Sequence, residues 1–138
     1  MTYWNKEITI YNRHEDSNNA VKYYRHNLKD CFFKRTNQKV MIGNTLLESN
    51  ENIVRIPQQK NYLSPWEWGK VDNKSDYLTI QPKDIIVFGN VADEIDEYSQ
   101  GQRASDLIAK YKALGTVFVR SVNDNTMLPI PHYCVKGE

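Results

Sequence analysis

The fold is decided by the stretch Ile80-Gln-Pro-Lys-Asp-Ile-Ile-Val-Phe-Gly89. Pro82 ends any regular structure before it, and Lys83-Asp84 has the composition of a turn. Four consecutive apolar residues, Ile85–Phe88, follow and stop at Gly89. A β-branched and aromatic run of this length, bounded by turn residues, predicts a strand buried on both faces. We therefore expect the rest of the chain to wrap around this strand.

Working outward, short apolar or alternating segments predict further strands, about six to eight in all. The segment Val21–Arg35 is one long bent strand or two short ones, interrupted near Asn27–Asp30. Turns are expected at His14–Asn19, at Gly43-Asn44, at Ser49–Asn52 inside a hairpin, and at Asn123–Asn125. The candidate segments from which these strands would form are Ile8–Asn12, Val21–Arg35, Val40–Ile42, Leu46–Leu47, Ile53–Ile56, Tyr77–Ile80, Ile85–Phe88, Thr116–Val122 and His132–Val135.

One helix is predicted, over about residues 103–114. Its apolar residues recur at helical spacing and share one face, which should pack against the sheet. Gly115 supplies the stop. The apolar face is Ala104, Leu107, Ile108, Tyr111 and Leu114.

Length and composition fit a single domain, residues 1–138, of the mainly β class. The expected architecture is a small antiparallel β-barrel with one short helix and long loops. The net charge is +1, from 18 basic and 17 acidic residues mixed along the chain. That balance argues against a protein that binds nucleic acid by an excess of Lys and Arg, and against attraction to a membrane surface. There is no apolar run of transmembrane length.

Residues that could carry chemistry do not form a recognisable site. His132 and Cys134 are two apart on a strand, but His14, His26 and Cys31 show no metal-ligand spacing, so ordinary packing is the better interpretation. Cys31 and Cys134 could form a disulfide. The polar start of the chain is unlike a signal peptide, however, which favours two free, buried thiols in a reducing cytoplasm.

The sequence contains no nucleophile elbow and no glycine-rich phosphate loop. The acidic run Asp93–Glu97 lacks calcium-loop spacing and is expected to be a solvated loop. We expect no catalytic residues, no metal and no cofactor.

The longest connection, residues 57–76, is unusual because loops of this length in compact domains generally have a function or are disordered. Tyr62, Trp66 and Trp68 make disorder improbable. Two interpretations stay open for Pro57–Ser75, which we call the aromatic loop. Its aromatic side chains either fold back and cap the barrel, or they become ordered against a partner.

Lys22-Tyr-Tyr-Arg25 and Phe32-Phe-Lys-Arg35 mix aromatic and basic residues. Such a mixture suits a platform on which single-stranded nucleic acid stacks. Alternating strand geometry gives the same pattern when aromatic residues enter a core and basic ones remain solvated, and we favour that explanation.

The order of these elements resembles the neck proteins of tailed bacteriophages. The likeness rests on the first strand Ile8–Asn12, the Pro82–Gly89 segment, Ser121–Asn125 and the ending Pro131–Gly137. Among those proteins the chain is most similar to head-completion, or stopper, head–tail connectors of phages that infect Gram-positive hosts.

The resemblance implies an oligomeric ring in the virion, at the head–tail junction and assembled in the host cytoplasm. Copies of the chain would contact the portal or adaptor protein on one side and the tail terminator or tail tube protein on the other. Packaged double-stranded DNA would pass through the channel, and a loop from each copy would help to retain it. The aromatic loop is then the candidate inter-subunit or channel loop, with Tyr62, Trp66, Trp68, Lys70 and Lys74 as its candidate residues.

Other functions stay open. A tail terminator or another tail-proximal ring protein would share these features. A single-stranded nucleic-acid-binding barrel and a small enzyme with an unrecognised pocket are further alternatives.

Overall fold

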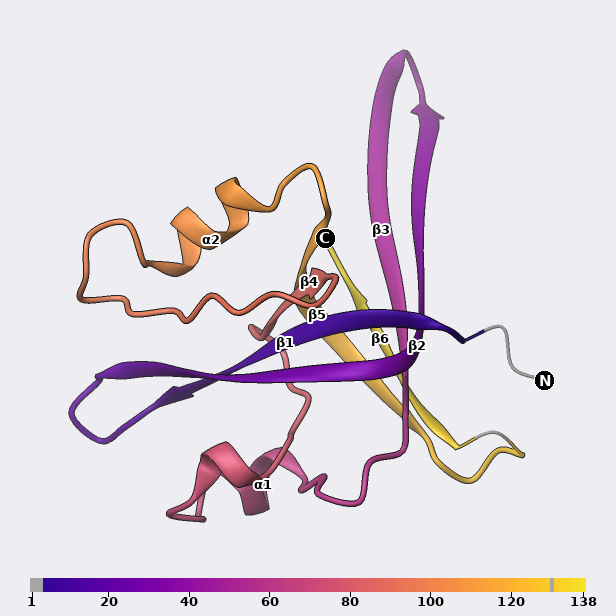
Figure 1. Ribbon diagram of the computed structural model, residues 1–138. Coiled ribbons are helices and arrows are strands. Elements are labelled where there is room, and N and C mark those ends of the chain that lie inside the picture. The colour runs from indigo at the N-terminus through magenta and orange to yellow at the C-terminus, as the bar shows by residue number, and fades with distance from the viewer. Residues whose placement is uncertain (1–3, 130) are drawn as a thin grey trace.

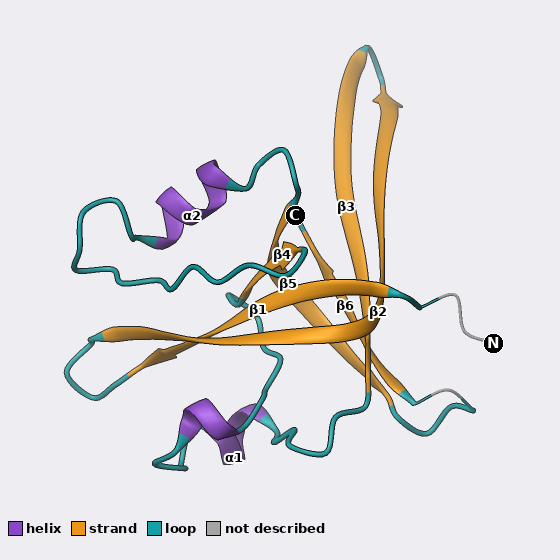
Figure 2. Cartoon of the chain, in the orientation of Figure 1, coloured by secondary structure: helices purple, strands orange, loops and turns teal. Residues whose placement is uncertain are grey.

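Six antiparallel strands form a closed barrel in the order β1-β2-β3-β6-β5-β4 (Figures 1 and 2). The computed structural model describes residues 4–129 and 131–138, and for 35–42 and 45–51 only the backbone. The expected mainly β fold, an antiparallel barrel with a short helix and long loops, is confirmed. The strands are β1 Lys6–Glu15, β2 Val21–Ile42, β3 Thr45–Pro57, β4 Ile85–Phe88, β5 Thr116–Asn125 and β6 His132–Gly137, and the helical segments are α1 Pro65–Trp68, the 3-10 turn η1 Lys74–Asp76 and α2 Ala104–Lys110.

Strand β4 is buried on both faces, as its sequence predicts. Its backbone pairs with β1 on one side and β5 on the other. Because side chains alternate along a strand, Ile86 and Phe88 point into the barrel, while Ile85 and Val87 enter a second core on its outer face. A continuous apolar run is the composition that such a strand requires.

The barrel interior is filled by side chains that every strand contributes. Phe33 and Phe88 stack there with ring centroids 4.0 Å apart. The interior is therefore a packed core, which includes Ile8, Cys31, Val54, Ile86, Val117 and Val135.

The second core lies between the outer face of the barrel and the segment that contains α2. Leu107 is buried in it, and Ala104, Ile108 and Tyr111 pack at its edge. The predicted helical face is therefore in contact with the sheet, although α2 ends at Lys110 rather than at residue 114. Leu114 lies beyond the helix and is half exposed.

Strand β2 is one continuous strand, the first of the two alternatives for this region. Its expected interruption is a distortion at Asp30, which has a φ of 60°. The pairing register between β1 and β2 shifts between Lys6 and Ile8, opposite this residue. A bulge of this kind bends a strand without ending it.

The hairpin between β2 and β3 turns at Gly43-Asn44, where Gly43 has a φ of 64°. The turn predicted at Ser49–Asn52 is wrong, because these residues pair with β2 as part of β3. Polar residues do not end the strand here, because the backbone pairing of β2 with β3 continues through them into the part of the hairpin that extends beyond the barrel (Figure 1). We call residues 35–51 the arm.

Two further predictions are corrected by the backbone. Tyr77–Ile80 is extended and largely buried, but it makes only an isolated bridge between Leu78 and Tyr62 and belongs to no strand. Asn123–Asn125 lies within β5 and pairs with β6, so the chain turns only after Asn125. Both predictions are wrong because backbone pairing with another segment decides whether a residue belongs to a strand, and local composition does not show that pairing.

None of the helices among the described residues has the length and apolar character needed to cross a membrane.

Candidate functional site

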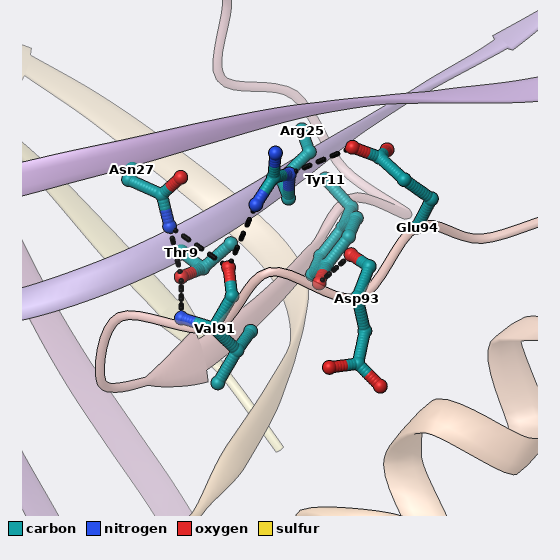
Figure 3. Close-up of polar contacts among 7 residues, drawn as sticks. All are labelled: Thr9, Tyr11, Arg25, Asn27, Val91, Asp93 and Glu94. Carbon is teal, nitrogen blue, oxygen red and sulfur yellow. Dashed lines mark hydrogen bonds and ion pairs between the residues drawn. The ribbon is translucent and has the colours of Figure 1, made fainter.

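Polar side chains of β1 and β2 hold the segment that follows β4 (Figure 3). Thr9 Oγ1 donates to the carbonyl of Gly89 at 2.8 Å and accepts from the backbone N–H of Val91 at 3.1 Å. Asn27 Nδ2 donates to Thr9 Oγ1 at 2.8 Å and to the Val91 carbonyl at 3.1 Å. Both backbone polar groups of Val91 are therefore satisfied by side chains, with no strand pairing.

A second set of contacts continues along the same segment. Arg25 Nη1 donates to the Val91 carbonyl at 3.0 Å, and its Nε forms an ion pair with Glu94 at 2.9 Å. Tyr11 Oη donates to the Asp93 carbonyl at 2.6 Å. Figure 3 shows these groups converging on the segment from the two strands.

The Asp93 carboxylate connects this segment to the end of α2. It accepts from Lys110 Nζ at 2.6 Å and from Tyr111 Oη at 2.5 Å. The bond from Lys110, followed by that from Tyr111, lowers the pKa of Asp93 below its usual value. We call the polar contacts of Figure 3, together with the Lys110 and Tyr111 bonds to Asp93, the clasp.

The clasp fastens one part of the chain to another and leaves no activated group. Burial raises the pKa of the Tyr11 hydroxyl, so this group remains a hydrogen-bond donor. The acidic run is less solvated than predicted, because Val91 and Ile95 are buried on either side of Asp93.

Asp84 is a buried carboxylate that fixes the turn before β4. Its Oδ2 accepts from Asn12 Nδ2 at 2.8 Å and from the Gln81 N–H at 3.1 Å, and its Oδ1 accepts from the Arg13 N–H at 2.9 Å. Burial raises the pKa of Asp84 to about 7, although these bonds oppose the shift. The carboxyl group links β1 to the turn, and its ionisation should affect stability.

An open pocket of about 230 Å³ lies between the end of β1 and α1. Arg13 and Glu15 at its edge form an ion pair of 3.4 Å. His14 meets Trp68 edge to face, and burial followed by the charge of Lys74 lowers the pKa of this histidine. The charged groups at the edge of the pocket are paired with each other. Among the described residues that line the pocket, no nucleophile and base converge.

Two candidate residues of the aromatic loop are part of the folded barrel. Trp68 is fully buried and donates from Nε1 to the Tyr77 carbonyl at 3.1 Å. Tyr62 stacks on Tyr133 with ring centroids 4.2 Å apart. These placements are those of the capping alternative, in which the aromatic loop folds back onto the barrel. The local signal is Ser64-Pro65, which caps and starts α1 and so aims Trp68 inward.

The other candidate residues of the aromatic loop are more accessible. Trp66 is 71% exposed, and Lys70 Nζ lies 3.3 Å from its ring centroid. Lys74 Nζ donates to the Val71 carbonyl at 2.6 Å and lies 5.8 Å from the Trp68 ring centroid. The structure therefore separates Trp66, which can meet a partner, from Trp68, which cannot without unfolding.

The aromatic residues of the suggested nucleic-acid platform are dispersed. Phe33 points into the barrel, Tyr24 packs edge to face on Trp68, and Tyr23 packs against the outer core. Phe32 lies under Arg55 on another part of the strand. No common surface of stacked rings results from the described residues.

The histidines and cysteines are also separate. Both cysteines are buried free thiols, and burial raises the pKa of Cys31 to about 12. His132 packs edge to face with Trp4, and burial lowers the pKa of His26. Among the residues whose side chains the structure describes, no three potential metal ligands gather.

Sequence reasoning missed the arm as the element that leaves the barrel. Pairing of β2 with β1 ends at Cys31, and pairing of β3 with β6 begins at Asn52. Between these points the strands pair only with each other in the described backbone. The available signal was the apolar Val40-Met-Ile42 followed by Gly43-Asn44, which predicts a tight hairpin.

The fold and these sites define a class, namely a small, mainly β protein whose polar clusters fasten its own segments and whose longest hairpin projects from a closed barrel. The chain belongs to a family described as "Family of unknown function (DUF6751)", whose model matches residues 1–138. No curated protein and no solved structure matches the chain.

Proposed function

We propose that this protein is a structural component of a phage virion neck. It would form an oligomeric ring that connects the portal or adaptor to the tail and helps to retain packaged DNA. The sequence resemblance suggests this role, and the arm is the observation in the structure that supports it best.

The arm supports assembly because a two-stranded hairpin is marginally stable alone in water. Residues 36–42 pair with residues 45–51, and the described backbone places no third strand beside either of them. Each side of the arm thus offers a row of backbone groups for pairing with another chain. A partner along these edges would give the arm the support that its own barrel does not.

The charges of the two arm strands favour a particular arrangement of copies. Around the arm, β2 carries Lys34, Arg35 and Lys39, whereas β3 carries Glu48 and Glu51. Contact between β2 of one copy and β3 of the next brings opposite charges together, whereas contact between like strands brings like charges together. Different surfaces meeting in this way generate a ring when the rotation between copies closes.

The test begins with a variant in which residues 36–51 are replaced by Asn-Gly, which connects Arg35 to Asn52 as a two-residue hairpin loop. Mass photometry and negative-stain microscopy should show rings for the full chain and monomers for the variant. Circular dichroism should show that the variant keeps its β content. A full-length chain that stays monomeric at all accessible concentrations would contradict a self-assembling ring.

Cysteine cross-linking tests which strands meet. Gln38→Cys and Ser49→Cys are made in separate, differently tagged chains, because these positions are register partners within one arm. The mixture should give a disulfide between the two tagged forms, while each variant alone should give little. Self-linking of each variant instead would indicate a two-fold contact between like strands.

The virion role itself is tested in phage particles. The protein should be detected by mass spectrometry in purified virions, and particles made without it should contain heads that lose DNA or lack tails. Absence from purified virions would contradict the neck assignment. A ring that caps an isolated tail would favour a tail terminator instead.

A further inference from the structure

The segment between β4 and β5 is a long excursion from an otherwise continuous hairpin. The last pair of the β4–β5 ladder is Val87 with Thr116, and the Phe88 N–H donates to the Gly115 carbonyl at 2.9 Å. The segment therefore leaves β4 and rejoins β5 at neighbouring positions, where the two strands are paired with each other. We call residues 90–114 the cover.

Glycines with positive φ stand at both ends of the cover. Gly89 has a φ of 134° and Gly115 a φ of 120°. These backbone angles are available to glycine and rare for other residues. A segment bounded by two such residues can rotate at its ends with little steric resistance, which is the property of a hinge.

The cover carries its own backbone hydrogen bonds. Asp96 N–H donates to the Gln102 carbonyl, Tyr111 N–H to the Leu107 carbonyl, and Gly115 N–H to the Tyr111 carbonyl. Among the described residues, the backbone–backbone bonds of residues 90–114 all close within the cover or at its Gly115 end. Opening would therefore break no strand ladder of the barrel.

Side chains alone fasten the cover to the barrel. The clasp contacts from β1 and β2 to Val91, Asp93 and Glu94 cross from the barrel to the cover, whereas the bonds of Lys110 and Tyr111 to Asp93 lie within the cover. The ion pair between Arg25 and Glu94 is partly solvated, with Glu94 61% exposed. Val91, Ile95 and Leu107 add the apolar contact. The exposed ion pair contributes little and is screened by salt. The attachment therefore rests on the apolar contact and on a few hydrogen bonds that each involve a side chain, with no continuous β-ladder.

We propose that the cover is a hinged unit, which opens as one piece about Gly89 and Gly115 while the barrel stays folded. Opening uncovers an apolar strip on β1 and β4 made of Tyr11, Ile85 and Val87, which are fully or almost fully buried in the closed form. Local opening at a free energy below that of global unfolding is the behaviour of a cooperative sub-unit of a fold. The cover thereby controls access to an apolar strand face.

The experiment measures thiol labelling at two matched positions. Val87 and Val117 are both fully buried and lie on adjacent strands, but Val87 lies under the cover and Val117 inside the barrel. Val87→Cys and Val117→Cys are made in the otherwise unchanged chain, and labelling by a thiol reagent is followed under native conditions. The parent chain, which contains buried Cys31 and Cys134, supplies the background rate.

The thiol at position 87 should be labelled at least roughly tenfold faster than the thiol at position 117, because local opening exceeds global unfolding. Thermal unfolding of both variants controls for unequal destabilisation. Equal labelling rates, both following the global unfolding rate, would overturn the proposal. A rate at position 87 equal to that of the urea-unfolded chain would also overturn it, since the closed form would not be populated.

A second variant tests the clasp directly. Glu94→Gln weakens the ion pair that joins the cover to Arg25 of β2 and should accelerate labelling at position 87 roughly two- to fivefold, with no change at position 117. Asp124→Asn is the control, because Asp124 bonds only locally to Thr126 and lies outside the cover. Equal acceleration at both positions would show that Glu94 stabilises the whole fold, which would contradict a separate cover.

Discussion

The aromatic loop and the arm are both long excursions from the barrel, and they behave in opposite ways. The aromatic loop is rich in large side chains and folds back, with Trp68 buried and Tyr62 stacked on Tyr133. The arm has a polar stem in its sequence and extends away from the other strands (Figure 1). The difference teaches that aromatic content marks a segment that covers its own fold, while a long polar hairpin marks one that leaves it.

Trp68→Ala should have the largest effect on the comparison. The side chain of this aromatic-loop residue is fully buried, so its loss should lower the free energy of unfolding by about 3–5 kcal/mol. Urea unfolding followed by circular dichroism measures this change. The matched control, Trp66→Ala, removes a 71% exposed ring and should change the free energy by less than about 1 kcal/mol. Similar losses for both would contradict the assignment of Trp68 to the core and Trp66 to the surface.

Asp84→Asn tests the buried carboxylate that fixes the turn before β4. The quantity measured is the pH dependence of the free energy of unfolding. Because the folded pKa of Asp84 is raised to about 7, the folded protein binds a proton that the unfolded chain has released. The wild-type free energy of unfolding should therefore fall, relative to the variant, as pH rises from about 4 to about 7.

The relative change should be on the order of 3 kcal/mol, since one unit of pKa shift corresponds to about 1.4 kcal/mol. Using the difference between the two proteins removes the contribution of the histidines, which titrate in both. A difference that stays constant over this pH range would show that Asp84 keeps an ordinary pKa in the fold.

Tyr62→Leu should have a smaller effect. The substitution keeps apolar bulk but removes the stacked pair with Tyr133, a contribution of about 0.5–1.5 kcal/mol. A double-mutant cycle with Tyr133→Leu, measured by urea unfolding, isolates this interaction. A coupling energy near zero would indicate that the aromatic loop is held by Trp68 alone.

Replacing residues 36–51 of the arm by Asn-Gly should have the smallest effect on the barrel. Residues 36–51 make no strand pairs with β1 or β6 in the described backbone, so the free energy of unfolding should change by less than about 1 kcal/mol. Thermal unfolding would measure this change. A loss of cooperative unfolding would mean that the arm supports the barrel as much as the aromatic loop does.

The parts predicted well from sequence are those where local pattern and burial agree. Ile85–Phe88 is apolar on both alternating faces, and each face enters a separate core. The face of α2 was visible in its spacing, because helical periodicity requires only the residues themselves. The fold class followed from these elements.

The parts predicted poorly depend on partners distant in sequence. Ser49–Asn52 has turn composition, yet pairing with β2 keeps it in a strand. Nothing local to Asp93 indicates that Lys110 and Tyr111 meet its carboxylate, or that Tyr11 meets its carbonyl. Likewise, the short helix that begins at Pro65 decides which aromatic residue of the loop is buried. The sequence therefore identifies the candidate residues but does not show which of them are buried and which are exposed.

If copies of this chain form the proposed ring, the packed interior of the barrel limits how they would surround DNA. With its interior filled by Phe33, Phe88 and the other side chains of the core, a single subunit has no bore through which a polymer could thread. In the proposed ring, the DNA channel would lie among several subunits, with the outer surfaces of their barrels as its wall. Its width would then be set by how many copies close the circle rather than by the size of the barrel itself.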